Sequence, residues 1–553
     1  MVASNVNITF LGGLGDVGRN CTCVEIDGKL LVIDFGVMFP DATMPGVDVI
    51  LPDTSWLAGR EEDIVGLVVT HGHEDHVGGV VHFLREFETT LYGSALTMGF
   101  AQQKVREAHL EDRTSFQVLK DGERLDIGPF DVEVLPITHS VPQSLCVVLH
   151  TAHGVVVHTG DFKLDSNPID GRITDLERLK QLRDGPGVRV LMADSTNADK
   201  PGWSASESTV GETFERRFSE WSDRRLVVSC FASHLHRVQQ ICDVAIREGR
   251  TIFPLGRSMI NNIRTAQELG VLELPHRYVD SIDRIGSYEP GAVCVICTGS
   301  QGEPNAALSL LAKSDHADLT LEPDDVVMLS SHPIPGNEIP VYRVIDQLTR
   351  LGCEVIHDGH EHVHTTGHAQ RDELRHLYDI VSPEWYVPIE GEYRMLQRNA
   401  DVVMGAGHEP DRSLVVLDGT QLTLDEGGLR VTGRVPAPYR FVDGILNDLS
   451  AEILDTRRKL SEGGFVHVVV LVSADTGLVG HPEIATQGWI DRDKSVTVLA
   501  ELEVEVAKAV EASIRDGKAP GDLERVVRRV TGQFVGNRTR RRPPISASVI
   551  TVD

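Results

Sequence analysis

Short segments of strand length follow one another along the first part of the chain. Residues 6–11 and 21–26 alternate apolar and polar positions, whereas 30–34, 64–70 and 189–193 are nearly continuous apolar runs. Alternation is typical of a strand with one solvated face, and a short apolar run is typical of a buried strand. The pattern therefore predicts several strands here, some of them buried.

Residues 211–362 follow a different rhythm, in which apolar strands alternate with amphipathic helical stretches. The elements predicted in this region are strands at 226–230, 252–255, 293–297 and 326–330 and helices at 212–221, 236–248 and 340–351. Such alternation is typical of a sheet covered by helices. A second α/β unit is therefore predicted after the first set of strands.

The chain after residue 362 returns to strands and then forms a small separate unit. The predicted elements are strands at 413–418, 429–431, 466–472, 490–492 and 545–552, helices at 498–517 and 522–533, and an extended linker that follows Arg434. The predicted organisation is a first domain in two parts (1–210 and 363–440), a second domain (211–362), a linker (441–462) and a C-terminal domain (463–553). A length of 553 residues agrees with several domains.

The most informative polar cluster follows the strand at 64–70. It reads His71-Gly72-His73-Glu74-Asp75-His76, and imidazole and carboxylate groups are the usual ligands of zinc and manganese. One short loop could direct His71 and His73 to one ion, and Asp75 and His76 to a second ion ~3.5–4 Å away, as in two-metal hydrolases.

More distant residues at strand ends are candidates for the rest of this metal site. His139 would complete the shell of the first ion, and Asp161 could bridge both ions. Asp34 ends another strand, where it either supports a metal-bound histidine or forms a turn.

Gly13, Gly15 and Gly18 match the G-x-G-x-x-G spacing of dinucleotide-binding loops, which require a following helix. The next residues, 21–26, alternate like a strand, so we predict a glycine loop beside the metal site instead.

Composition limits the classes of function. A net charge of -29 excludes a nucleic-acid binder held by bulk electrostatics, so any RNA or DNA would be bound locally by metals and a few cations. Eight cysteines do not form a disulfide scaffold, and Cys294 and Cys297 are predicted to be buried free thiols. A reducing cytoplasm and no membrane association are expected, because no apolar stretch approaches ~20 residues.

Several motifs together resemble the β-CASP nucleases of the metallo-β-lactamase superfamily, and among them the ribonuclease J family. The strings that carry the resemblance are LGGLGDVGRN at 11–20, THGHEDHVGG at 70–79, HTGDFK at 158–163 and DSTNA at 194–198. The resemblance implies an α/β fold, in which a metallo-β-lactamase αββα sandwich carries an inserted β-CASP α/β domain and a small α+β C-terminal domain.

The resemblance also implies an activity and its partners. The substrate would be single-stranded RNA, preferably 5′-monophosphorylated, degraded 5′→3′ and also cut internally, in RNA maturation (including rRNA processing) and mRNA decay. Two divalent metal ions are implied, with Zn²⁺ the expected metal and Mn²⁺ or Mg²⁺ the alternatives. A homodimer or dimer of dimers is implied, and other RNA-decay enzymes are conceivable partners.

The resemblance assigns roles residue by residue. The implied metal ligands are His71, His73, Asp75, His76, His139, Asp161 and Glu390, and the implied catalytic residues are Asp75, Asp194 and His368. The implied substrate contacts are Ser233, His234, Leu235, His364, Thr365, Thr366, Gly367 and His368. Asp34 would lie behind the ligands, and Asp48 and Asp443 would share a structural cation.

One position departs from the family pattern. The family has a metal-binding histidine where this chain has Glu390, in the string EGEYRM at 390–395. Because glutamate is longer, negatively charged and a harder ligand, we expect the second metal to be bound differently or more weakly, with a shift towards Mn²⁺ or Mg²⁺.

Two alternatives remain open on the sequence alone. One is an RNA-binding scaffold whose metal site has decayed, and the other is a thioester or lactam hydrolase on the same core, against which the 211–362 insertion argues. The basic run Arg538–Arg542 either contacts RNA or is a solvated or interface surface.

Overall fold

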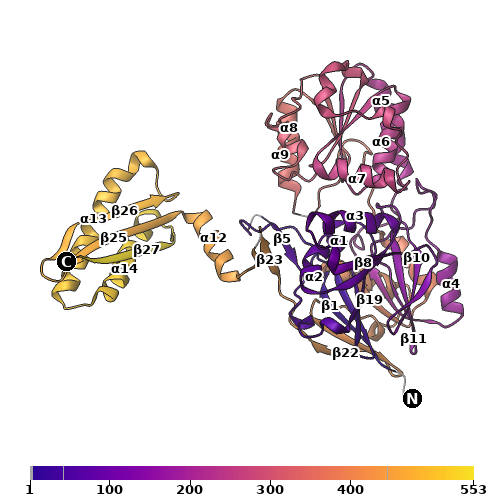
Figure 1. Cartoon of the computed structure of the whole chain (residues 1–553), viewed down its shortest axis with the longest axis horizontal. Helices are drawn as coiled ribbons and strands as arrows, with labels where there is room; N and C mark the ends of the chain where they lie inside the picture. Colours follow the sequence, from indigo (N-terminus) through magenta and orange to yellow (C-terminus); the bar gives the residue numbers. More distant parts are fainter. Residues whose placement is uncertain (1–3, 42, 335, 445, 553) are drawn as a thin grey trace. The chain divides into compact units, whose positions relative to one another are not determined.

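The computed structural model describes residues 4–41, 43–334, 336–444 and 446–552. The chain forms two compact units, Met1–Met38 with Ile50–Tyr439 and Phe39–Val49 with Arg440–Asp553, which are described separately (Figure 1). In the described part of the chain, no helix is both long and apolar enough to cross a membrane.

Two sheets form the core of the first unit. The strands of one sheet are β1 (Val6–Gly12), β3 (Cys21–Ile26), β4 (Lys29–Ile33), β6 (Ile64–Val68), β7 (Thr89–Gly93), β8 (Thr114–Val118), β21 (Thr420–Asp425) and β22 (Gly428–Arg434). The strands of the other are β9 (Arg124–Ile127), β10 (Phe130–Pro136), β11 (Leu145–Thr151), β12 (Gly154–His158), β13 (Val188–Asp194) and β19 (Trp385–Ile389). Among the described residues, their orders are β22-β21-β1-β3-β4-β6-β7-β8 and β19-β13-β12-β11-β10-β9.

The two sheets pack face to face. Ile8 and Val24 of one sheet share a buried cluster with Val134 and Val147 of the other. The helices outside the second sheet are α4 (Leu176–Asp184), α10 (Arg371–Val381) and α11 (Tyr393–Gly405), which bury apolar side chains against it. Helices α2 (Val80–Glu86) and α3 (Ala95–Glu107) pack together, and α3 contacts β7 and β8 of the first sheet. The result is the predicted αββα sandwich.

The predicted inserted unit is a parallel sheet with helices on both faces. Its strands are β14 (Leu226–Ser229), β15 (Thr251–Leu255), β16 (Val293–Cys297), β17 (Val326–Leu329) and β18 (Glu354–His357), in the order β15-β16-β14-β17-β18. Its main helices are α5 (Ser208–Glu220), α6 (Leu235–Arg247), α7 (Arg257–Glu268), α8 (Ala307–Ala312) and α9 (Glu338–Arg350). Figure 1 shows α5 and α6 on one side of the sheet and α8 and α9 on the other.

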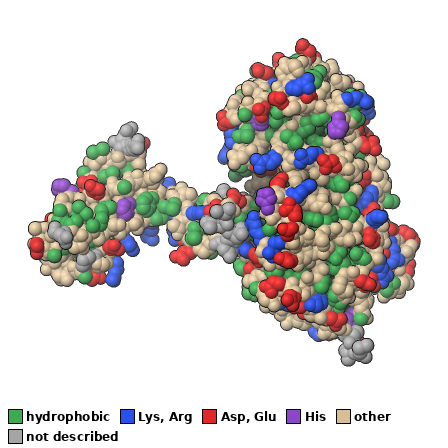
Figure 2. Space-filling model, viewed as in Figure 1, with side chains coloured by type: hydrophobic (Ala, Val, Ile, Leu, Met, Phe, Trp, Pro, Cys, Tyr) green, Lys and Arg blue, Asp and Glu red, His purple; other side chains and the backbone are tan. Residues whose placement is uncertain are grey.

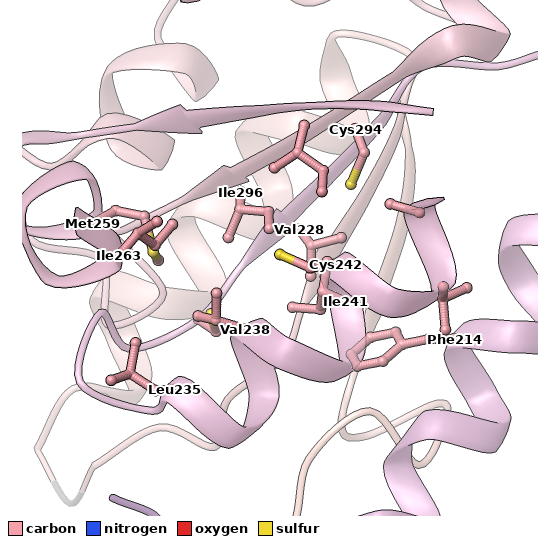
Figure 3. Packing of buried hydrophobic residues seen from close by; sticks show 14 of the residues in the cluster. Phe214, Val228, Leu235, Val238, Ile241, Cys242, Met259, Ile263, Cys294 and Ile296 are labelled. Carbon is pink, nitrogen blue, oxygen red and sulfur yellow. The ribbon is translucent and has the colours of Figure 1, made fainter. Parts of the chain in front are cut away.

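Apolar packing explains this arrangement. Val238 and Ile241 of α6 face Val228 of β14 and Ile296 of β16 in a buried cluster (Figure 3). The strands read as continuous apolar runs because helices cover both faces of a parallel sheet. All eight cysteines of the chain are buried and free, as predicted for the pair in β16.

The second unit contains the last sheet and two long helices. Its elements are β23 (Arg440–Asp443), β24 (Leu446–Leu449), α12 (Ala451–Gly463), β25 (Phe465–Ser473), β26 (Gly477–Gln487), α13 (Arg492–Arg515), α14 (Pro520–Thr539) and β27 (Ile545–Val552). Strand β25 lies between β26 and β27. Apolar residues of α13 and α14 share one buried cluster with this sheet, which gives an α+β unit.

Two local predictions were wrong. In the described part of the chain, the run 413–418 pairs through a bridge at Ser413 and forms no ladder, and its last residue, Asp418, accepts from the Leu14 N–H. The extended segment predicted after Arg434 includes β23, and α12 then begins at an N-cap where Ser450 accepts from the Ile453 N–H. Residues 490–492 form no strand because α13 begins at Arg492. The strand that pairs with β25 is β26, which lies earlier in the chain and contains Gly and Pro residues that interrupt the alternation typical of a strand.

Candidate metal centre

Four side chains converge on one point at the ends of β6, β10 and β12. The ring atoms His71 Nε2 and His139 Nε2 each lie 3.1 Å from His73 Nδ1. Asp161 Oδ2 lies 3.5 Å from His71 Nε2 and 3.6 Å from His139 Nε2. Ligand atoms of a tetrahedral zinc ion lie about 3.4 Å apart, so this group has the spacing of a metal site.

The other carboxylate oxygen of Asp161 faces a second group. Asp161 Oδ1 lies 3.3 Å from His76 Nε2, which is 3.7 Å from Asp75 Oδ2. These three residues form a separate set of donors, as His71, His73, His139 and Asp161 form the first. Because Asp161 presents one oxygen to each set, the geometry is that of a carboxylate between two ions.

His76 is held in place from behind. Its Nδ1 lies 2.8 Å from Asp34 Oδ2, and Asp34 also accepts hydrogen bonds from the Thr70 N–H and hydroxyl at 2.7 and 2.8 Å. A carboxylate on Nδ1 fixes the tautomer that leaves Nε2 free as a ligand. The backbone at Gly36 also packs closely against the backbone at Asp75, because a Cβ on Gly36 would lie 1.6 Å from the Asp75 carbonyl oxygen.

Burial sets the protonation of these groups. It lowers the pKa of His71 and His139 well below the ordinary value, so both rings are neutral and able to bind metal. Burial opposes ionisation of Asp161, but His76 and His368 outweigh it and hold its pKa well below the ordinary value. The neutral imidazoles of the first set and an ionised carboxylate are the donors that a divalent cation requires. Burial lowers the pKa of His76, but the charges of Asp161 and Asp34 outweigh it and hold that pKa well above the ordinary value, so a cation would bind there in exchange for a proton.

Glu390 reaches this centre from the turn after β19. It is buried, has a left-handed backbone (φ 57) and groups with Asp34 and His76 as potential donors. Burial and the charge of Asp161 raise the pKa of Glu390 well above the ordinary value. Within the described residues, its Oε2 has no hydrogen-bond partner. A bound cation would satisfy this oxygen.

Asp194 and His368 form a pair on the other side of Asp161. His368 Nδ1 lies 2.8 Å from Asp194 Oδ2, and His368 Nε2 lies 3.9 Å from Asp161 Oδ2. Burial lowers the pKa of His368, but the charges of Asp194 and Asp161 outweigh this effect and raise it to about 9. His368 therefore carries a proton at neutral pH, within reach of the candidate metal centre.

A cluster of polar side chains lies where the inserted unit meets the sandwich. The rings of His234 and His364 are 6.4 Å apart, and His234 Nε2 lies 3.4 Å from Glu207. Glu207 makes two hydrogen bonds to Arg237, which is fully buried and also donates to the Val363 carbonyl at 2.8 Å. His364 Nδ1 has no partner among the described residues, so it is available to a ligand.

Other candidate residues are occupied by the protein itself. The side chain of Leu235 is buried in the apolar core, and the Thr365 hydroxyl donates to the Ala205 carbonyl. Gly367 is required by packing, since a Cβ there would lie 2.8 Å from the His139 ring. The Thr366 hydroxyl lies 2.7 Å from Asn197 Nδ2, and Ser233 is partly exposed.

The two residues predicted to share a structural cation have contacts within the protein. Asp443 forms an ion pair with Arg457, and Asp48 Oδ2 accepts from the Gly444 N–H at 2.7 Å. Arg538 pairs with Glu501 at 2.9 Å, and Arg541 donates to the Glu462 carbonyl at 2.7 Å. The basic run is thus partly engaged within its own unit.

Comparison with known proteins identifies the family. Residues 14–198 match the metallo-β-lactamase superfamily, 223–348 match the ribonuclease J β-CASP domain and 452–552 match the ribonuclease J C-terminal domain. Ribonuclease J of Mycobacterium tuberculosis is 38% identical over 555 residues, which cover 100% of this chain and 98% of the relative. The chain belongs to the ribonuclease J family.

Other relatives agree. Ribonuclease J of Thermus thermophilus is 33% identical over 554 residues (99% of this chain, 95% of the relative), and ribonuclease J 1 of Streptococcus pyogenes is 32% identical over 553 residues (100% and 98%). A solved Enterococcus faecalis protein of unknown function, 15% identical, covers 76% of this chain and 100% of its own with a TM-score of 0.52, which shows the fold alone.

Ribonuclease J membership and the buried donor sets together identify a metal-dependent ribonuclease that hydrolyses phosphodiester bonds in RNA. The αββα core, the β-CASP domain and the C-terminal domain predicted from the sequence are confirmed. The scaffold and small-molecule alternatives are less well supported.

Sequence reasoning missed three residues near the site. Asn20 Nδ2 lies 2.9 Å from His76 Nε2, and Glu207 and Arg237 form the buried ion pair beside His234. Asn20 had a signal, because it ends the glycine-rich segment that was expected beside the metal site. Glu207 and Arg237 had none, since single charged residues in helical sequence are usually solvated.

Proposed function

We propose that this member of the ribonuclease J family uses two divalent ions to degrade single-stranded RNA 5′→3′ from a 5′-monophosphate, and that it also cuts RNA internally. The observation that carries the proposal is the position of Asp161, whose two oxygens face two separate sets of donors. A pair of ions at such a carboxylate supplies Lewis-acid charge that activates water and stabilises the charge developing on a phosphate.

The chain's own residues supply the remaining chemistry. His368 is protonated beside Asp194 and would give its proton to the 3′ oxygen that leaves. The cluster of His234 and His364 would bind the phosphate of the RNA 5′ end, and the partly exposed Ser233 lies next to His234 in the chain. Asp34 and Thr70 keep His76 oriented throughout.

The two metal positions differ in chemistry. The first has three ring nitrogens and one carboxylate, which suits Zn²⁺. The second has Asp75, Asp161 and one imidazole, with Glu390 nearby in place of a histidine, which suits a harder ion such as Mn²⁺ or Mg²⁺.

Surface charge supports a local mode of RNA binding. The chain has a net charge of -29, and Figure 2 shows acidic and basic side chains interspersed over the face in view. The affinity for RNA would therefore come from the metal centre and from the cluster of His234 and His364, and not from counterion release. We further propose roles in RNA maturation and mRNA decay and assembly as a homodimer or dimer of dimers.

The test is cleavage of an end-labelled, 5′-monophosphorylated single-stranded RNA with Mn²⁺. The native protein is expected to release mononucleotides, and a 5′-triphosphorylated RNA of the same sequence is expected to resist release from its end. His71→Ala, which removes one donor of the first set, controls for contaminating nucleases and should be inactive.

Glu390→His measures the consequence of the substitution in this chain. We expect the native protein to cleave with Mn²⁺ and the metal preference of the variant to shift from Mn²⁺ towards Zn²⁺, because an imidazole replaces an oxygen ligand at the second site. Cleavage by the variant alone would mean that the native second site is too weak to act. Binding of RNA without cleavage by either protein would contradict the proposal and favour the scaffold.

A further inference from the structure

The glycine-rich segment 12–20 ends at Asn20 and contains a short strand, β2 (Leu14–Gly15), which pairs with β20 (Gly391–Glu392). Gly13, Gly15 and Gly18 have φ angles of 94, 110 and 107°, and Arg19 has a φ of 47°. These left-handed conformations are strained for residues with side chains, so only a glycine-rich sequence follows this path at low cost. The loop is therefore built for one conformation, not for flexibility.

Buried contacts hold the end of the loop. The side chain of Arg19 is only 2% exposed, donates to the Leu11 carbonyl at 3.1 Å and forms an ion pair with Asp418. Asp418 also accepts from the Leu14 N–H at 2.9 Å, and the ring of Tyr439 lies 4.8 Å from the guanidinium. Loss of the Asp418 carboxylate would leave the Arg19 charge buried without a counter-ion, so this contact holds Arg19 and the residue that follows it in place.

Asn20 is placed beside the second set of donors. Its N–H donates to the Asp75 carbonyl and its carbonyl accepts from the Gly36 N–H, both at 3.0 Å. Its side-chain Nδ2 lies 2.9 Å from His76 Nε2, the atom that faces Asp161 and Asp75. Asn20 is 6% exposed, so its amide group is shielded from bulk water.

Two buried oxygens remain unpaired at this place. Among the described residues, neither Asn20 Oδ1 nor Glu390 Oε2 has a hydrogen-bond partner. Asn20, Glu390 and Asp34 line the same small cavity, and a Cβ on Gly13 would lie 2.3 Å from Asn20 Oδ1. An unpaired buried oxygen costs about 1–3 kcal/mol, so two of them beside a metal centre indicate a missing cation.

We propose that Asn20 is a ligand of the second metal ion, which it binds through its amide oxygen together with Glu390. The inference rests on the proposed two-metal function. The side-chain nitrogen of Asn20 now lies against His76 Nε2, the ring nitrogen that a metal would bind. A half-turn of the amide brings Oδ1 to the present place of Nδ2, 2.9 Å from Nε2.

The donor types suit a six-coordinate ion, because Mg²⁺ and Mn²⁺ prefer oxygen ligands. The 2.9 Å between Asn20 Nδ2 and His76 Nε2 is short enough for donors at these two places to bind one ion. Asp75, Asp161, Glu390 and Asn20 would contribute oxygens and His76 the one nitrogen. Two oxygen ligands thus take the place of one imidazole, and the second site selects Mn²⁺ or Mg²⁺ over Zn²⁺.

The test is Mn²⁺ binding to the metal-stripped full chain, measured by calorimetry without RNA. Asn20→Ala and the isosteric Asn20→Leu remove the oxygen and are expected to weaken the second ion at least tenfold while the first is unchanged. Asn20→Asp keeps an oxygen and is expected to bind the second ion at least as tightly as the native protein. Asn7→Ala removes an amide that pairs with Thr423 on the adjacent strand, and it should bind both ions normally.

Equal binding of the second ion by Asn20→Ala and the native protein would overturn the proposal. So would a loss in Asn20→Asp as large as that in Asn20→Ala, since it would assign the effect to the N–H and not to the oxygen. Thermal unfolding of the metal-free proteins identifies variants that fail to fold. The binding measurement contains no RNA. A failure of the proposed ribonuclease activity can therefore be distinguished from a failure of Asn20 to bind the second ion.

Discussion

Asp161 connects all the chemistry of this site. Its two oxygens face the two sets of metal donors, and it lies 3.9 Å from the ring of His368. A buried carboxylate with so many partners is expensive to ionise, and only the surrounding positive charge makes it possible. Replacement of this one side chain should therefore affect both metals, whereas replacement of any other ligand should affect one.

Asp161→Asn is expected to weaken both metal ions by at least tenfold, because it removes a negative charge from each donor set. Asp75→Asn, the matched carboxylate-to-amide change, is expected to weaken only the second ion. Metal analysis after dialysis against a weak chelator measures both. Loss of a single ion from Asp161→Asn would contradict the bridging position.

The pair of Asp194 and His368 should control the alkaline limit of the reaction. The pKa of His368 is raised to about 9, so the proton that it donates is present below that pH and is lost as the pH rises through it. Asp194→Asn removes the largest charge that raises this pKa. The alkaline limb of the rate profile should move to lower pH, and the rate at pH 7 should fall by ~10²–10⁴.

Single-turnover cleavage rates from pH 6 to 10 measure this shift. Asp199→Asn, a partly exposed carboxylate close in sequence that pairs with Arg394, is the control and should leave the profile unchanged. An unshifted alkaline limb in Asp194→Asn would exclude His368 as the proton donor.

At the scale of elements, a buried ion pair joins the two domains of the first unit. Glu207 precedes α5, where the chain leaves the sandwich, and Arg237 lies on α6. Arg237 also donates to the Val363 carbonyl, where the chain returns. Both segments that connect the sandwich to the inserted domain therefore contact the Arg237 guanidinium. This contact positions the cluster of His234 and His364.

Glu207→Gln is expected to destabilise the protein by about 3–5 kcal/mol, because it leaves the Arg237 charge buried without a counter-ion. The pKa of Glu207 is held well below its ordinary value, since Arg237 and His234 outweigh burial. Its contribution is therefore complete above about pH 4.5 and is lost only as the pH falls below that value.

Urea denaturation at pH 5, 6, 7 and 8 measures the difference, which should be constant over this range. Glu215→Gln breaks an exposed pair with Arg247 and is the control, with an expected effect below about 1 kcal/mol. A small effect of Glu207→Gln would mean that water or another group compensates Arg237.

Elements with strong apolar patterns were predictable from the sequence. Strands β6, β13 and β16 and the final strand β27 lie where their apolar runs indicated, because burial selects them directly. The run 413–418 misled, since its apolar residues pack without forming a ladder. The donors within 71–76 were recognisable from spacing, whereas the contact of Asn20 with His76 depends on a loop path that only tertiary packing defines.

At the scale of the whole molecule, the first domain is discontinuous in sequence. Strand β1 pairs with β21 through partners such as Val6 and Leu424, and β13 pairs with β19 through Val190 and Trp385. The complete inserted sheet lies between these partners along the chain. Both sheets of the sandwich therefore depend on strands that come from opposite ends of the insertion.

This connectivity has a consequence during protein synthesis. At ~5–20 residues per second, β13 leaves the ribosome about 10–40 s before β19, and its edge stays unpaired while the inserted domain folds. His368 and Glu390 are translated later than every other residue of the centre. On the proposed roles, a nascent chain that ends before His368 has the first set of metal donors but lacks the proton donor. The centre can therefore be completed only after the whole inserted domain has been synthesised.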